Sequence, residues 1–142
     1  MQEFLNVPSE WIYHWESLAI ACAVDIVLNG ETQQTHLVVF SDNTNSVNSF
    51  HSLRGPPYNN RLLRHSADLL ITQDHQLQVI YIPGDLNVIA DALSRHEFSK
   101  ARNLSPGIFI NENFSIPTSI LSQSKDHLLN VTPATHVGAA QK

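Results

Sequence analysis

The most constraining feature of this sequence is a short apolar run, residues 37–42 (Leu-Val-Val-Phe-Ser-Asp), that ends on a carboxylate. An unbroken run of β-branched and aromatic residues predicts a strand covered on both faces, as in the parallel sheets of α/β proteins. Open α/β sheets bind ligands at the carboxyl ends of their strands, so Asp42 is the first candidate for chemistry. The alternative interpretation is that Asp42, Asn43 or Thr44 caps a following helix.

A second strand is predicted over residues 77–82, where another apolar run is ended by Pro83-Gly84. The residues between the two strands favour helices over 44–53 and 58–72. A helical crossover of this kind joins parallel strands and is right-handed in nearly all proteins. The sequence therefore predicts an α/β fold in which two parallel strands lie side by side, flanked by helices.

Residues 15–28 are apolar almost all round, rich in alanine, and followed by Asn29-Gly30, which predicts a buried helix. At 100° per residue, Glu16 lies on the same face as Ile20 and Val27, so its carboxylate follows an apolar stripe. A buried carboxylate needs a hydrogen-bond donor, a counter-charge or a metal. The alternative is a partly exposed glutamate that the helix dipole favours in the first turn.

A later helix is predicted over residues 88–97, with Asp85 or Asn87 as its cap. Its Asp91 stands one turn before Arg95, which is the spacing of an ordinary surface ion pair. In the functional interpretation, Asp91 is instead a third carboxylate that reaches the same rim as Asp42.

Glu16, Asp42 and Asp91 thus come from three separate elements and form a candidate metal site. Carboxylate oxygens are the ligands that Mg²⁺ prefers, and Mg²⁺ keeps several waters that a phosphate can displace. We therefore predict these three residues as metal ligands and catalytic groups, with Mg²⁺ or Mn²⁺ as the cofactor. The sequence has no zinc-type spacing of His and Cys, no Gly-rich phosphate loop and no nucleophile elbow.

The predicted helix over 58–72 is amphipathic, with four leucines on one face and charged side chains on the other. The charged face carries Arg61, Arg64, His65 and Asp68. Such a face can meet a phosphate backbone, or it can simply be solvated, with Arg64 and Asp68 paired at i,i+4.

Composition bounds these hypotheses: 142 residues with 42% hydrophobic content indicate one globular domain with a modest core. The single cysteine, Cys22, excludes an intrachain disulfide and favours an intracellular protein, cytoplasmic or nuclear. The longest apolar run, 18–24, predicts no membrane span. The net charge of -5 argues against a general polyanion binder, although six of the eight basic residues fall between positions 54 and 102.

The two ends of the chain carry weaker patterns. Residues 1–14 are predicted to be an irregular lead-in, with a short strand near 11–13, and residues 99–142 an irregular linker or tail rich in Asn, Ser, Pro and Thr. Residues 108–110 either add a short strand or lie over the core. The domain itself is then expected to span residues 15–98.

Three stretches carry a resemblance to a known family: Glu-Ser-Leu-Ala at 16–19, Phe-Ser-Asp-Asn-Thr at 40–44, and Tyr-Ile-Pro-Gly-Asp-Leu-Asn-Val-Ile-Ala-Asp-Ala-Leu-Ser-Arg at 81–95. Together they resemble the ribonuclease H domain at the end of retroelement reverse transcriptases. The last stretch is the most specific and is similar to gypsy-like and DIRS-like retrotransposons. Residues 43–59 resemble the fungal branch that carries a tyrosine recombinase.

The resemblance covers about residues 11–98 and implies a two-Mg²⁺ nuclease that cuts the RNA strand of an RNA/DNA hybrid. By motif, Glu16, Asp42 and Asp91 match three of the family's four carboxylates. Hybrid or other nucleic acid would be the partner, together with an upstream polymerase segment, and no membrane. The implied nucleic-acid contacts are Asn43, Thr44, Arg61, Arg64 and Arg95.

This sequence departs from the family where the first aspartate is expected, because only about fourteen residues precede the helix of Glu16. The resemblance therefore implies an N-terminally truncated domain that lacks the first three strands. Two functions follow from it: a ribonuclease H, whose isolated chain is expected to be inactive, or a non-catalytic remnant that binds nucleic acid or protein.

Overall fold

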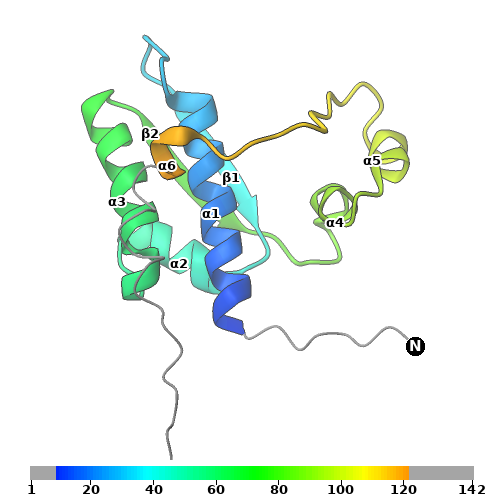
Figure 1. The fold of residues 1–142 in the computed structure, drawn as a ribbon, viewed down its shortest axis with the longest axis horizontal. Coiled ribbons are helices and arrows are strands. Elements are labelled where there is room, and N and C mark those ends of the chain that lie inside the picture. The colour runs from blue at the N-terminus through cyan, green and yellow to red at the C-terminus, as the bar shows by residue number, and fades with distance from the viewer. Residues whose placement is uncertain (1–8, 122–142) are drawn as a thin grey trace, which may run out of the picture.

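The computed structural model describes residues 9–121 and shows a mixed α/β fold with a parallel two-stranded sheet (Figure 1). Two helices lie between the two strands in the sequence. The elements are α1 (Ser9–Leu28), β1 (His36–Ser41), α2 (Thr44–Ser52), α3 (Pro57–Thr72), β2 (Gln76–Tyr81), α4 (Val88–Ser94), α5 (Phe98–Leu104) and α6 (Thr118–Leu121).

The parallel pairing of the two predicted strands is confirmed. β1 and β2 run side by side in a register that places Leu37 beside Leu77 and Val39 beside Val79. These four side chains share one face of the sheet, since alternate residues of a strand point to the same side. The α2–α3 crossover between the strands provides the connection that parallel pairing requires.

Helices α1 and α3 pack side by side and cover this face of the sheet (Figure 1). The core between them contains Val24, Leu28 and Leu62, all with no exposed surface, together with Val79 from β2. At about 25 cal/mol per Å² of buried apolar surface, this layer is the main source of stability in the described fold.

The opposite face of the sheet is exposed, so the prediction of a strand covered on both faces is wrong for the described residues. Val38 is 41% and Phe40 58% exposed. An apolar run is compatible with burial on both faces of a strand, but it does not show whether another element packs on the second face.

The outer edge of β1 is also open within residues 9–121. The amide of Gln76 donates to Thr35 O, and that of Ile82 donates to Ser41 O, so these carbonyls face β2. The backbone N–H and C=O groups of successive strand residues point alternately to the two edges of the strand. The N–H and C=O groups of His36, Val38 and Phe40 therefore point away from β2, and no other described residue bonds to them.

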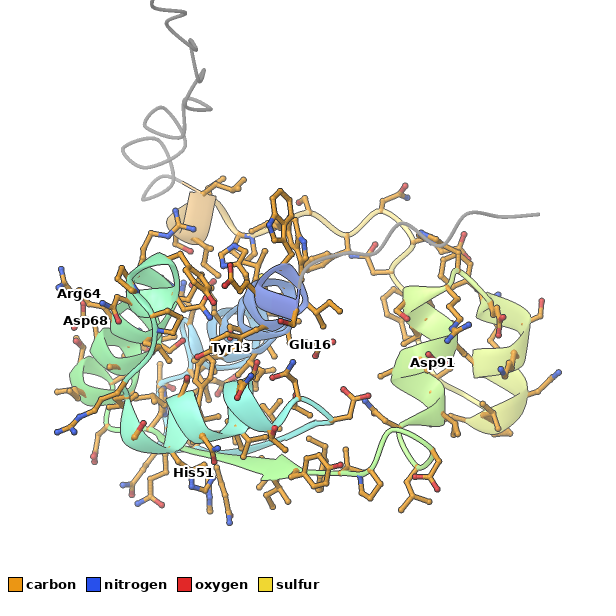
Figure 2. All side chains as sticks on the ribbon, turned by 90° about the horizontal axis from the view of Figure 1, so that it is seen from below. Tyr13, Glu16, His51, Arg64, Asp68 and Asp91 are labelled. Atoms are coloured by element: carbon orange, nitrogen blue, oxygen red, sulfur yellow. The ribbon has the colours of Figure 1, made fainter. Side chains whose placement is uncertain are left out.

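The outer edge of β2 is partly closed by α2. His51 Nε2–H donates to the carbonyl oxygen of Val79 at 2.6 Å, which satisfies a backbone acceptor that would otherwise face solvent. Figure 2 shows His51 projecting from α2 towards the strand. The two edges of the small sheet thus differ, and β1 carries the open one.

A buried polar network fixes α1 against α2 and α3. The Tyr13 hydroxyl bonds to Ser49, and the Ser17 and Ser46 hydroxyls lie 3.2 Å apart. The amide of Asn59, which has no exposed surface, donates to Ser17 Oγ at 3.2 Å and accepts from His14 Nδ1 at 2.7 Å. Satisfied buried groups of this kind specify one arrangement of the helices, because any other would leave them unpaired.

Helices α4 and α5 form a hairpin that lies apart from this body (Figure 1). They pack on each other through buried Ala92 and Ala101. The chain then returns along residues 105–117 to α6, which places Ile120 in the core beside α1.

Several predictions for the chain ends are wrong. Residues 9–14 are the first turns of α1, and no strand forms at 11–13. Residues 98–104 and 118–121 are helical, and residues 108–110 are not a strand. The polar composition of these segments gave no apolar periodicity from which their helices could be predicted. Residues 1–8 and 122–142, the remaining parts of the lead-in and tail, lie outside the described residues.

With its additional turns, α1 reaches 20 residues and is long and apolar enough to cross a membrane by length and composition, a test that core helices of soluble proteins also pass. Half of it is buried inside the fold. This burial is compatible with the core helix of a soluble protein.

Candidate carboxylate site at the ends of the strands

Asp42 follows β1 directly and is exposed at its carboxyl end. The cap of α2 is its neighbour Asn43, whose Oδ1 accepts the Ser46 amide at 3.0 Å. This bond decides the alternative posed by the sequence: Asn43 satisfies the helix end, and the Asp42 carboxylate is left available for other contacts.

Glu16 lies near Asp42 although the two come from different elements. It is partly buried on α1, and its pKa is raised above the ordinary 4.5, first by burial and second by the negative charge of Asp42. Two carboxylates that repel each other across a partly desolvated gap favour a proton or a cation between them.

The loop after β2 closes on the same place. A side-chain carbon at Gly84 would come within 3.3 Å of Asp42 Oδ2, so the absence of a side chain leaves room beside this carboxylate. The carboxyl ends of both strands therefore meet at one rim, as parallel pairing predicts.

Asp91 does not join the other two carboxylates, and the prediction that all three converge is wrong for it. Its Oδ1 lies 3.0 Å from Arg95 Nε in a solvent-exposed pair, the alternative that the i,i+4 spacing allowed. Figure 2 shows Asp91 on α4, well separated from Glu16 on α1. Within residues 9–121 no three His, Cys, Asp or Glu side chains are grouped to hold a metal.

The loop explains the separation. Turn hydrogen bonds from Leu86 N to Pro83 O and from Asn87 N to Gly84 O carry the chain away from the sheet before α4 begins. Helix α4 then packs on α5 instead of on the body. A sequence motif identifies the residues of such a loop but does not determine the direction in which the next helix leaves.

The predicted nucleic-acid contacts come from different parts of the fold: Asn43 and Thr44 follow Asp42, Arg61 and Arg64 lie on α3, and Arg95 follows α4. Asn43 Oδ1 is used as a cap, and the Arg95 guanidinium is paired with Asp91. Thr44 is exposed at the start of α2, while Arg61 is partly buried on α3.

Arg64 is exposed on α3, and the predicted ion pair with Asp68 does not form between these two described residues. Both side chains point outward from the helix (Figure 2). Their roles in binding nucleic acid stay predictions.

The structure reveals a buried acidic group that the sequence did not single out. Asp25, which is only 5% exposed on α1, accepts from His65 Nε2 at 2.7 Å and from Ser119 Oγ at 2.9 Å. It links α1, α3 and α6. The signal was an aspartate within an apolar helix, which requires partners in the fold.

Comparison with family models, with curated proteins and with solved structures found no match to this chain. Among the described residues, Glu16 and Asp42 are the two predicted ligands that interact electrostatically, and carboxylate oxygens are the ligand type that hard divalent cations take. The described residues do not fit a two-metal centre, which needs further carboxylates.

Proposed function

We propose that this chain is a ribonuclease H-like domain derived from a retroelement reverse transcriptase, whose ancestral reaction is cleavage of the RNA strand of RNA/DNA hybrids. The motifs at 16–19, 40–44 and 81–95 support this descent. The parallel strand pair and the position of Asp42 at its rim agree with it.

The observation that carries the proposal is the position of Asp42 at the carboxyl ends of the strands, beside Gly84, where its charge raises the pKa of the partly buried Glu16. One divalent cation held between them would neutralise their repulsion and present a positive centre to a phosphate. Mg²⁺ supplies Lewis-acid polarisation of the phosphoryl oxygen when bound. The protein's part is to hold the two carboxylates on two rigid elements, Glu16 within α1 and Asp42 directly after β1.

The separation of Asp91 favours the second candidate function, a non-catalytic module that retains nucleic-acid binding. With two carboxylates together, the described residues do not position both the attacking and the leaving oxygen of a phosphodiester. Misplacement by about 1 Å can cost roughly a hundredfold in rate. We therefore propose little or no hybrid cleavage by the isolated chain.

Cation binding is tested by thermal unfolding with increasing Mg²⁺ or Mn²⁺. A ligand that binds only the folded state raises the Tm by mass action, because at 100 times its Kd it adds about 2.7 kcal/mol to the free energy of unfolding. We expect Glu16→Gln and Asp42→Asn each to reduce the shift. Asp68→Asn, an exposed aspartate on α3, is the matched control and should keep it. An unchanged shift in both site variants would reject the carboxylate pair as the binding site.

Activity is tested with a labelled RNA/DNA hybrid and Mn²⁺. The non-catalytic candidate predicts binding without cleavage, measured by anisotropy on the same substrate. Cleavage that Asp42→Asn abolishes would favour the ribonuclease instead. If the hybrid binds neither the wild-type chain nor Asp42→Asn, both candidate functions are rejected.

A further inference from the structure

Helix α1 turns an apolar face away from the core. Five large side chains on it are about half exposed, and two alanines, Ala19 and Ala23, lie between them. The five are Trp11 (59%), Ile12 (48%), Trp15 (54%), Ile26 (55%) and Val27 (45%). At 100° per residue they fall on one side of the helix. The exposed face of a surface helix is typically polar, so a contiguous apolar patch of this kind indicates an interaction surface.

The centre of this face is hollowed. A groove of about 430 Å³ runs along α1 and is bordered by the segment that precedes α6. Trp15 and Ile26 stand at its two ends, Ala19 and Ala23 form its floor, and Phe114 forms part of its far wall. Large side chains around small ones provide both a projection and a hole, which allows the face to receive a surface of the same shape.

We propose that this face binds a second copy of the chain, with the two α1 helices packed antiparallel about a twofold axis. An axis level with Ala19 places Trp15 opposite the partner subunit's Ala23, and Ile12 opposite the partner subunit's Ile26. Each Trp15 then meets the floor of the other copy's groove. A twofold interface requires this self-complementarity.

The exposed area is sufficient for such a contact. The aromatic side chains Trp11, Trp15 and Phe114 are each about half exposed. Because one aromatic side chain can bury about 150–250 Å², the three together still offer roughly 300 Å² for a contact. With the aliphatic side chains, the face reaches on the order of 600 Å² per copy. This is the lower end of what specific interfaces bury.

The charges along the seam are compatible with a second copy. Asp25, the acid that precedes Ile26 on α1, is turned inward to His65 and Ser119. Antiparallel packing also sets the positive end of each helix dipole beside the negative end of the other. Glu16 borders this face next to Val27, but the dimer uses the apolar side chains and needs no cation, so it does not depend on the proposed function.

Sedimentation velocity over a concentration series tests the dimer. We expect the mass to rise from 15.9 kDa towards twice that value in the micromolar range. Ile26→Glu should keep the chain monomeric at every concentration. Ile71→Glu, at a 77% exposed site on α3, adds the same charge elsewhere and should dimerise like the wild type. Circular dichroism shows whether each variant is folded.

Tryptophan emission gives a second measurement, because both tryptophans of the chain lie on this face. Dimerisation should shift their emission to the blue as concentration rises, in the wild type and in Ile71→Glu but not in Ile26→Glu. A wild type that stays monomeric, or equal weakening by both variants, would overturn the proposal. A blue shift that appears only with phosphatidylcholine vesicles would assign the face to a membrane instead.

Discussion

The body formed by α1, α2, α3 and the sheet differs from the α4–α5 hairpin in how each is held together. The body joins residues far apart in sequence through buried side chains, such as Asp25 with His65 and Asn59 with Ser17. The hairpin relies on neighbours, with exposed ion pairs at Asp91–Arg95 and Glu97–Lys100. Of the three stretches that carry the resemblance, those at 16–19 and 40–44 lie in the body, and only the end of the third, 88–95, lies in the hairpin. The predicted metal ligands therefore belong to two parts of the molecule that are held together in different ways.

The largest expected difference concerns the apolar core. Leu62→Ala removes a side chain with no exposed surface and should cost about 2–5 kcal/mol of unfolding free energy, because it leaves a cavity between α1 and α3. Leu93→Ala, at a partly buried site in the hairpin, should cost well under half as much. Urea denaturation followed by circular dichroism measures both. Equal losses would show that the hairpin shares the core of the body.

The two acid–base pairs provide the next comparison. His65→Ala takes a donor from the buried Asp25 carboxylate and should cost about 1.5–3 kcal/mol, the range for hydrogen bonds to charged groups. Arg95→Ala breaks an exposed pair and should cost less than about 1 kcal/mol. Thermal unfolding at neutral pH separates the two. A large loss from Arg95→Ala would mean that α4 has a partner beyond α5.

Much of the body could be predicted from sequence, because periodicity and turn residues are local signals of burial. The strands, their parallel pairing, and the helices at 44–53 and 58–72 were predicted within one residue at each end of most elements. Glu16 was expected at a helix start, but α1 begins at Ser9 and places it inside the helix. Asp42 lies at a strand end as expected, and its charge raises the pKa of Glu16. Apolar faces that must be buried leave few alternatives for such elements.

The hairpin could not be predicted in the same way. Whether Asp91 reaches the rim depends on the direction in which the turn at 83–87 sends α4, and its hydrogen bonds lie within the turn itself. Helix α4 has an apolar face, Val88, Ile89, Ala92 and Leu93, but such a face does not specify which element it packs against, and in the structure α4 packs on α5. The ion pair Asp91–Arg95 and the metal-ligand role were therefore equally compatible with the sequence, and the structure supports the ion pair.

The helix caps offer a smaller test of the same contrast. Asn43→Ala removes the side-chain acceptor of the Ser46 amide at the start of α2 and should cost about 1 kcal/mol. Asn87 occupies the corresponding position before α4 but makes no side-chain cap bond. Asn87→Ala should therefore change the unfolding free energy by only a few tenths of a kcal/mol. The two variants are compared in one urea titration series, and a reversed order would contradict the assigned caps.

The smallest effect is a pH dependence that belongs to the body alone. Because burial and Asp42 raise the pKa of Glu16 above 4.5 in the folded chain, the folded state binds more protons than the unfolded state just above that pH. The contribution of Glu16 to stability is then greatest below pH 4.5 and falls as pH rises through the raised pKa. Solvent screening should keep the change below about 1 kcal/mol.

Glu16→Gln cannot ionise, so its Tm should decline less than that of the wild type between pH 4 and pH 7. Asp42→Asn should remove part of the decline, because the charge of Asp42 is the second cause of the shift. Glu31→Gln, at an exposed site after α1, serves as the control and should keep the wild-type slope. If Glu16→Gln instead follows the wild-type curve, the two carboxylates are not electrostatically coupled, and the proposed cation site loses its main support.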